Sequence, residues 1–460
     1  MTRFSIVIAF VAALMVTAAY VWSSRVKGPS IEILQPQHLV GMESSLDVTI
    51  ETPRGTLSVV DMVLEQGDLQ LPLFSLVAPQ DAKISQLGTD RVRIQRSIGK
   101  NSSPQLKAGS ARLLITAERS ALFGFRSVET VIERDLELQF EPPRLSVVST
   151  HHFITHGGAE MIVYRVDPPD VMSGVKVGDV VYPGYPAAGA DVDNADPTLK
   201  VALFALLHDQ DLKTPIELFA EDKALNQGQA SIDYRVFSRE FSRSRINITD
   251  VFIDRVIPPI LKRSPGLDVN WRPDDKIRVS AFQRVNADLR EINASTVLAL
   301  ADQTAPEILW QGAFQQLSNS QVESKFADQR TYYYKGNEID RQVHLGFDLA
   351  VTAAVQVSAA NRGRVLHADY LGIYGNCVVL DHGMGLQSLY AHLSSVSVQP
   401  GELVERGQMI GRSGMTGLAG GDHLHFSMLL QGRPISSLEW WDSHWIQDRV
   451  VRKLNNAGGT

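Results

Sequence analysis

Three short stretches near the end of the chain decide its fold and its chemistry: HLGFD at 344–348, LYAHLS at 389–394 and GDHLHF at 421–426. Side chains two residues apart in a strand point to the same face, so His423 and His425 are expected to lie side by side. Together the stretches supply four histidines and the carboxylate of Asp348. These are donor types of a catalytic zinc site, in which three protein ligands leave a fourth position open for water.

His344 and Asp348 are four residues apart, with Gly346 between them. They can converge on one point only at a turn or a strand end, and glycine gives the backbone that freedom. Each motif taken singly is more typical of ordinary surface or hydrogen-bonded core histidines. Their occurrence in one domain, with a third histidine after an aromatic strand between them, favours a metal site. Imidazole and carboxylate donors without a cysteine cluster indicate zinc in a catalytic rather than a structural site.

Residues 332–446 resemble the lysostaphin/LytM-type zinc metalloendopeptidases, a family that cuts peptidoglycan peptides. The resemblance is carried by HLGFDLA at 344–350, by the stretch from VSAANRG to GMTG at 357–417, and by GGDHLHF at 420–426. It implies an antiparallel β domain whose site lies in a groove on one sheet.

The resemblance assigns roles to five positions of this chain. It implies that His344, Asp348 and His425 bind zinc and that His392 and His423 serve the reaction. Some relatives have lost ligands and act only as activators of other hydrolases. All five positions are kept here, which favours an enzyme.

Two residues depart from the family pattern. Asp422 stands where proline is common before the His-Leu-His motif, and Ser427 stands where glutamate is common after it. Neither departure touches an implied ligand, so they bear on substrate contacts.

An apolar run from Phe4 to Trp22 is just long enough to span a bilayer as a helix, and Arg25 and Lys27 follow it. We interpret residues 1–28 as an uncleaved signal anchor, with a cleavable signal peptide as the alternative. The wall-directed resemblance implies a single-pass protein of the bacterial inner membrane with its body in the periplasm.

Composition is that of a folded globular body: 44% of the 460 residues are hydrophobic and 21% are charged. The formal net charge of -7 gives no basic field for nucleic acid. The one cysteine, Cys377, lies in an apolar run and is expected to be a buried thiol. Stability must therefore come from hydrophobic cores rather than disulfides.

The predicted fold is mainly β. After the anchor we expect two β-sandwich-like domains at 29–143 and 144–243, because short alternating segments recur between turns. A helical connector at 244–317 and an antiparallel β metallopeptidase domain at 318–460 complete the chain. The two β-sandwich-like domains are candidate surfaces for binding a protein partner in the cell envelope.

The helical connector shows apolar residues at helical spacing from Ile248 to Ile260, and Pro258 and Pro259 are expected to break that helix. It is either a rigid spacer or an arm that docks near the catalytic groove and limits substrate entry.

A biotinyl or lipoyl carrier domain is an alternative fold for the glycine-rich region around 398–411. Carrier domains present a modifiable lysine, and no lysine occurs between Lys335 and Lys453. The sequence therefore predicts a zinc endopeptidase acting on peptidoglycan cross-links, with a non-catalytic wall-binding or activator protein as the alternative.

Overall fold

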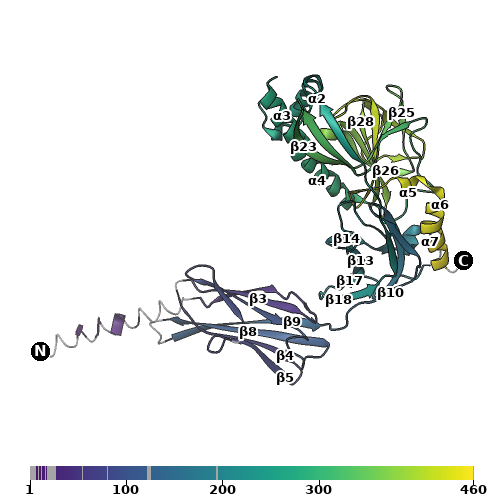
Figure 1. Ribbon diagram of the computed structural model, residues 1–460. Helices are drawn as coiled ribbons and strands as arrows, with labels where there is room; N and C mark the ends of the chain where they lie inside the picture. The colour runs from purple at the N-terminus through teal and green to yellow at the C-terminus, as the bar shows by residue number, and fades with distance from the viewer. Residues whose placement is uncertain are drawn as a thin grey trace. The chain divides into compact units, whose positions relative to one another are not determined.

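The computed structural model describes residues 27–458 except 54, 80, 122–125 and 193–194, together with eight positions between 7 and 17. The predicted signal anchor therefore falls mostly outside the described residues. Among the residues that are described, none of the helices combines the length and apolar character needed to cross a membrane. The described chain is mainly β with a few helices (Figure 1).

The first compact unit contains residues up to 143 and residues 221–228. Two sheets share one hydrophobic core there, as expected of a sandwich-like domain. In spatial order the sheets are β1 (Ser30–Gln35), β3 (Ser44–Glu51), β7 (Arg91–Ile98) and β6 (Lys83–Gln86), and then β2 (Leu39–Val40), β9 (Arg126–Leu138), β8 (Gly109–Ala121), β4 (Leu57–Gln66) and β5 (Leu69–Ser75).

The second compact unit contains residues 144–220 and 229–460. Its N-terminal part has three sheets, made of β10 (Arg144–Val147), β12 (Ala159–Asp167), β16 (Leu199–Ala205) and β15 (Tyr185–Pro186); of β14 (Val180–Pro183), β13 (Met172–Val177), β17 (Ile216–Glu221) and β18 (Gln227–Ser231); and of β11 (His152–Thr155) and β19 (Tyr234–Phe237).

The C-terminal part is built on a large sheet in which the pairings between neighbouring strands are antiparallel, as predicted. Its strands, in spatial order, are β21 (Gln321–Ser324), β24 (Phe347–Ala350), β32 (His423–Leu430), β28 (Leu386–Leu393), β27 (Asn376–Gly383), β26 (Gly363–Tyr370) and β30 (Leu403–Val404), with β33 (Arg433–Ile435) on β32. A small sheet of β25 (Gln356–Ser358), β31 (Met409–Arg412) and β29 (Ser395–Val396) joins it.

A separate three-stranded sheet connects the helices to this domain. It consists of β20 (Arg243–Ile248), β22 (Asp328–Tyr334) and β23 (Asn337–His344). The start of the predicted helical connector is therefore wrong, since 243–248 forms a strand parallel to β22. The alternation of exposed Arg243, Arg245 and Asn247 with less exposed residues fits a strand.

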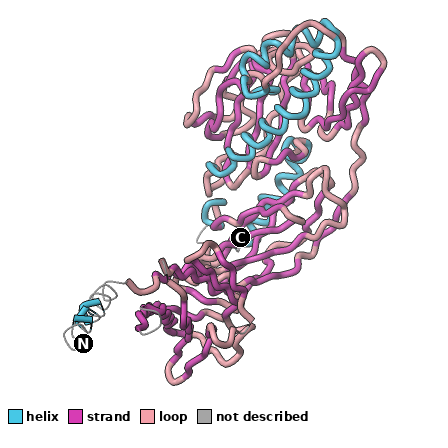
Figure 2. The backbone as a smooth tube through the Cα atoms, turned by 90° about the vertical axis from the view of Figure 1, so that its left-hand side faces the viewer, coloured by secondary structure: helices cyan, strands magenta, loops and turns pink. Residues whose placement is uncertain are grey.

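The connector itself is helical, with α2 (Asp250–Arg263), η3 (Pro265–Leu267), α3 (Asp275–Gln283), η4 (Arg284–Leu289), α4 (Arg290–Leu300) and η5 (Ala301–Gln303). In Figure 1 helices α2, α3 and α4 gather beside β23, and in Figure 2 they form the upper group of cyan coils. The prediction that Pro258 and Pro259 break the helix is wrong. Proline's fixed φ is itself helical, so its cost is a lost hydrogen bond, and the neighbouring Ile257 and Ile260 are fully buried.

One hydrophobic core joins the N-terminal part of the second unit to its large sheet. Tyr164 and Phe204 of the N-terminal part belong to the same buried cluster as Tyr390 and Phe426 of the large sheet. Trp440 of α5 (Leu438–Trp441) is fully buried in it, and α6 (Ser443–Ile446), η7 (Gln447–Val451) and α7 (Arg452–Gly458) follow. The three predicted segments from 144 to 460 thus belong mostly to one compact unit, and the predicted boundary at 317–318 stays a prediction.

Glu439 of α5 is a polar connection inside this unit. Its carboxylate accepts a hydrogen bond from the backbone N–H of Ala159, at 2.9 Å. Burial raises the pKa of Glu439 to about 7, against partial compensation by that hydrogen bond and by Arg239. The folded state therefore favours the protonated carboxyl.

This raised pKa predicts a pH-dependent loss of stability. The contribution of Glu439 is fully present below pH 4.5 and is lost as pH rises through about 7, because the unfolded chain releases the proton earlier. The Glu439→Gln variant cannot ionise, so its urea midpoint relative to the parent should rise between pH 5 and pH 8. In the free energy of unfolding, the expected change in the difference between variant and parent is on the order of 3 kcal/mol. A midpoint difference that stays constant with pH would contradict the prediction.

Candidate metal centre

Strand register in the large sheet brings together two of the predicted ligands, and the end of an adjoining sheet supplies the third. Asp348 on β24 and His425 on β32 are direct cross-strand partners, and His344 ends the neighbouring strand β23. Residues opposite each other in adjacent strands share one face of the sheet. His344 and His425 are buried, at 5% and 6% exposure.

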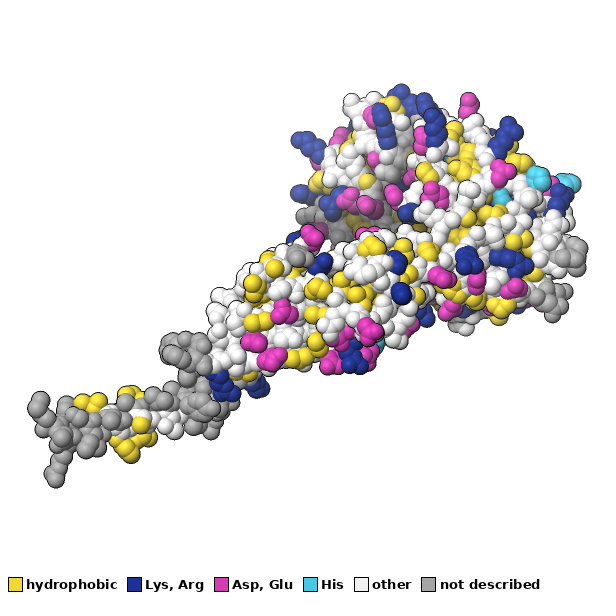
Figure 3. All heavy atoms as spheres, turned by 90° about the horizontal axis from the view of Figure 1, so that it is seen from below, with side chains coloured by type: hydrophobic (Ala, Val, Ile, Leu, Met, Phe, Trp, Pro, Cys, Tyr) yellow, Lys and Arg dark blue, Asp and Glu magenta, His cyan; other side chains and the backbone are white. Residues whose placement is uncertain are grey.

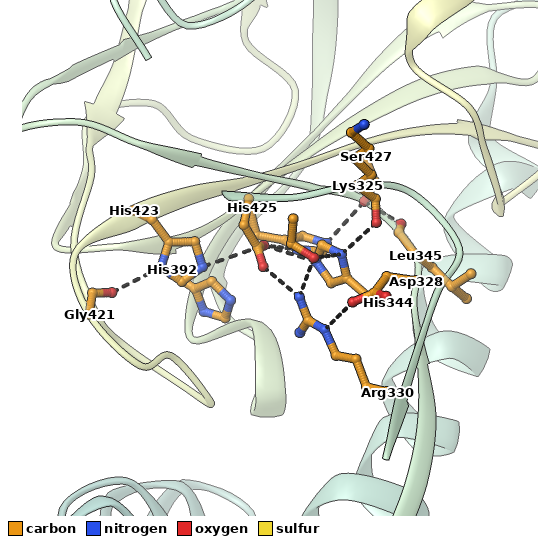
Figure 4. A network of polar contacts seen from close by, with 12 residues as sticks. Lys325, Asp328, Arg330, His344, Leu345, His392, Gly421, His423, His425 and Ser427 are labelled. Carbon is orange, nitrogen blue, oxygen red and sulfur yellow. Dashed lines mark hydrogen bonds and ion pairs between the residues drawn. The ribbon is translucent and has the colours of Figure 1, made fainter. Parts of the chain in front are cut away.

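Three donor atoms of these side chains converge (Figure 4). His344 Nε2 lies 2.9 Å from both Asp348 Oδ1 and His425 Nδ1, and His425 Nδ1 lies 3.0 Å from the same Oδ1. The sequence-predicted ligands are therefore assembled into one cluster.

Gly346 is needed for this assembly, but not for backbone freedom as the sequence suggested. A Cβ at Gly346 would lie 2.6 Å from the ring of His425 and 2.5 Å from Ser427 Oγ. The segment from His344 to Asp348 can pass His425 this closely only because residue 346 has no side chain.

Hydrogen bonds on the outer sides of the two rings define their tautomers. His344 Nδ1 lies 3.1 Å from the carbonyl oxygen of Lys325, which can only accept, so this nitrogen carries the proton. Ser427 Oγ donates to the carbonyl of Leu345 and lies 3.0 Å from His425 Nε2, which therefore donates to Ser427. Both rings consequently present a lone pair to the shared centre.

Ser427 was noted in the sequence only as a departure from a family pattern. The structure gives it a role in orienting His425, which no sequence signal indicated.

Charges around Asp348 keep it ionised. Burial alone would raise the pKa of this carboxyl, but His344, His423 and His425 outweigh burial and hold it well below its usual value. Burial lowers the pKa of His425 to about 4, so this imidazole is neutral near pH 7. A carboxylate and a neutral imidazole are the ionisation states in which these groups bind a metal.

His392 and His423 lie on the other side of the cluster. Their ring centroids are 4.9 Å apart, and His423 Nε2 is 3.5 Å from Asp348 Oδ1. Ala391, not His392, is the cross-strand partner of His425, so simple alternation would turn His392 to the opposite face. The φ of +62° at His392 departs from strand geometry at this position. Left-handed backbone at a residue other than glycine is uncommon and concentrates at functional sites.

The Nδ1 atoms of these two histidines are both bound by backbone carbonyls. His392 Nδ1 lies 2.8 Å from Thr416 O, and His423 Nδ1 lies 2.9 Å from Gly421 O. Each ring therefore carries its neutral-state proton on Nδ1 and leaves Nε2 available. Burial lowers the pKa of His392 well below its usual value, whereas Asp348 raises that of His423 despite burial.

Arg330 of β22 is part of the site and was missed by sequence reasoning. Its Nη2 donates to Asp348 Oδ2 at 2.9 Å and to Ser324 Oγ at 2.7 Å, while its Nε donates to Asp328 at 3.3 Å (Figure 4). Asp328 in turn accepts from Ser244 Oγ at 2.9 Å. One carboxylate oxygen of Asp348 thus faces the two histidines and the other is held by an arginine. The Asp-x-Arg spacing on one strand is the only trace of this in the sequence.

Comparison with known proteins agrees with this geometry. Residues 342–437 match Peptidase family M23. The chain is 38% identical over 96 residues to the peptidoglycan DD-endopeptidase ShyA of Vibrio cholerae, which covers 21% of this chain and 22% of that protein. It is 36% identical over 95 residues to the murein hydrolase activator EnvC of Escherichia coli, covering 21% of this chain and 23% of EnvC.

A crystal structure of a putative peptidase M23 from Pseudomonas aeruginosa shares 18% identity, with a TM-score of 0.39, and covers 63% of this chain and 95% of that one. The chain spans about a quarter or less of the curated relatives it matches. The sequence likeness to these curated relatives is confined to one segment, and residues 342–437 of this chain are a peptidase family M23 domain.

Proposed function

We propose that this protein is a zinc-dependent endopeptidase that hydrolyses the peptide cross-links of bacterial peptidoglycan. The observation that carries the proposal is the convergence of His344 Nε2, Asp348 Oδ1 and His425 Nδ1 on one point. Support also comes from the M23 domain and from relatives such as the peptidoglycan DD-endopeptidase ShyA.

The donor set fits zinc. Two imidazole lone pairs and a carboxylate oxygen about 3 Å apart repel one another unless a positive charge lies among them. Two histidines and one carboxylate are a known donor set of catalytic zinc, which keeps a further position open. His344, Asp348 and His425 would hold the ion.

The chain's other residues then supply proton transfer and orientation. Bound zinc lowers the pKa of a coordinated water toward about 7 and polarises a carbonyl group. His392 and His423 keep Nε2 available beside the cluster, where each can stabilise negative charge on a carbonyl oxygen or pass a proton to a leaving amine. Lys325 and Ser427 keep the ligand histidines in the required tautomers.

The test is incubation of the purified full-length protein with isolated peptidoglycan, followed by mass spectrometry of the products. We expect cross-linked dimers to decrease and uncross-linked stem peptides to increase, with loss of activity in a chelator and recovery on adding zinc. Intact cross-links after prolonged incubation of the zinc-loaded protein would contradict the proposal.

A non-catalytic role is the second candidate, because EnvC is named as an activator of murein hydrolases. The same incubation separates the two, since an activator would release products only when another hydrolase is present. The complete set of five site residues supports the enzyme.

We further propose a single-pass location in the bacterial inner membrane, with the body in the periplasm and room for an envelope partner on the β domains. The apolar run of residues 4–22 and the extracytoplasmic position of a peptidoglycan substrate support it. Among the described residues on the face drawn in Figure 3, Lys and Arg are interspersed with Asp and Glu, which does not suit a nucleic-acid partner.

Arg330→Ala should weaken zinc binding about 10-fold or more, the usual scale for loss of a group that orients a metal ligand. The change leaves Asp348 Oδ2 without its 2.9 Å donor and frees the carboxylate to rotate. Competition with a chromophoric chelator measures the affinity. Arg341→Ala is the matched control, because Arg341 lies on the neighbouring strand β23 and pairs with exposed Glu338 of that same strand. An unchanged or tighter affinity in Arg330→Ala would refute the orienting role.

A further inference from the structure

The loop SGMTGLAGGD at 413–422 orients the two predicted catalytic histidines. The carbonyl of Thr416 accepts from His392, and the carbonyl of Gly421 accepts from His423. Four of its ten residues are glycine. Glycine has the largest conformational freedom to lose on folding, so such a loop holds one conformation only where other groups restrain it.

The Thr416 end of this loop is restrained by the peptidase domain itself. Thr416 Oγ1 donates to Leu393 O at 2.8 Å and accepts from the N–H of Asn376 at 2.9 Å. Gly417 is packed so closely that a Cβ would lie 2.4 Å from the backbone of Gly375. The carbonyl that binds His392 therefore has local anchors.

The Gly421 end is different. A Cβ placed on Gly420 or Gly421 would meet no heavy atom within 4 Å, so these residues have open space around them. On the C-terminal side the loop is fixed by Asp422, whose carboxylate accepts from Ser413 Oγ at 2.6 Å and from Ala354 N–H at 3.0 Å. On the N-terminal side the N–H of Leu418 donates to Ile373 O at 2.8 Å within the peptidase domain. The two residues between Leu418 and Gly421 have a restraint that comes from outside the peptidase sheet.

That restraint is Arg255 of helix α2. Its Nη2 donates to Ala419 O at 3.0 Å and to Gly420 O at 2.7 Å, the two carbonyls immediately before Gly421. Leu418 packs on the apolar cluster formed by α2, so the same helix also holds the preceding residue. The helix is itself fixed by four buried residues on its inner face, Ile253, Val256, Ile257 and Ile260.

We propose that Arg255 is a positioning residue for His423: it fixes the 419–420 backbone so that the Gly421 carbonyl keeps the His423 ring in its Nδ1-protonated tautomer. The helical segment is then a working part of the active site. The kinetic consequence rests on the proposed peptidase function, whereas the effect on His423 does not. His392 should be independent of Arg255, because Thr416 has its own anchors.

The test uses the full-length, zinc-loaded protein as parent, Arg255→Ala, Arg255→Lys and Arg263→Ala. Arg263 is the matched control, because it lies on the same helix and its guanidinium stacks 4.6 Å from the centroid of Tyr370. Imidazole ¹H–¹⁵N correlation spectra report the tautomer of each histidine, and zinc content, kcat and KM on soluble peptidoglycan fragments are measured in parallel.

Arg255→Ala should keep its zinc and its His392 signals, lose the parent His423 Nδ1–H signal, and lower kcat about 10-fold or more with little change in KM. Lysine offers one point charge in place of a fork of donors, so Arg255→Lys should restore part of the effect. Arg263→Ala should match the parent. Should the parent prove inactive, the His423 spectra decide the proposal alone.

Parent-like His423 signals in Arg255→Ala would overturn the proposal, as would equal losses in Arg255→Ala and Arg263→Ala. Arg255 is an exposed side chain, so its truncation removes little core packing.

Discussion

Replacing His344, Asp348 or His425 with alanine should reduce the zinc content of the purified protein from about one ion per chain toward zero. Each substitution removes one of three converging donors, and two remaining donors bind zinc far more weakly than three. The Asp348→Ala substitution also removes the negative charge of the cluster, because the carboxylate that contacts both imidazoles is the one anionic donor of the three.

Elemental analysis after dialysis against a weak chelator measures this effect. His367→Ala is the control, since His367 lies in strand β26 and contacts the carbonyl of Asp369. Full zinc occupancy in all three ligand variants would show that the metal, or the site, has been misassigned.

Substitution of His392 or His423 should have the opposite pattern. These variants should keep most of their zinc and lose peptidase activity by roughly 100-fold or more, the scale of an acid–base or oxyanion contribution. Neither residue belongs to the converging donor set, although His423 Nε2 is 3.5 Å from Asp348 Oδ1.

His392 needs a second variant, because its φ is +62°. Asparagine tolerates left-handed backbone better than alanine, so His392→Asn separates loss of the imidazole from backbone strain. Activity is followed by release of soluble stem peptides from peptidoglycan. Parent-level rates in His392→Asn, or in His423→Ala, would remove that histidine from the mechanism.

The sequence could predict the histidines and Asp348 because the chemistry of the site is written in residue type and short spacing. His423 and His425 share a face by the two-residue period of a strand, and the family resemblance supplied the partners. The juxtaposition of Asp348 and His425 then follows from strand register, and the short turn after β23 brings His344 to them.

Arg330, Arg255 and Ser427 could not be found in the same way. Their roles depend on contacts between segments far apart in the chain, such as Arg255 with Gly420, which are 165 residues apart. An arginine on a strand or helix is ordinarily a solvated charge, and nothing local distinguishes these two.

The prediction of secondary structure at the start of the helical connector failed for a related reason. Residues 244–248 were expected to belong to the helical connector, but the pairing of 243–248 with β22 decides their conformation, and β22 lies about 80 residues later in the sequence. The prolines of α2 show the reverse case, in which burial of the surrounding isoleucines overrides a local helix-breaking signal.

The parallel pairing of β20 with β22 has a consequence for motion. The helical segment begins after β20 and the chain returns to the adjacent strand β22, so both of its ends are attached to the same sheet. The helical segment cannot rotate outward about a single hinge together with β20, because the six residue pairs between β20 and β22 would then have to separate. Such an opening is a sub-global unfolding event, which is rare and slow compared with the motion of a surface loop. Amide hydrogens of β20 should accordingly exchange on the timescale of the sheet rather than on that of a surface arm.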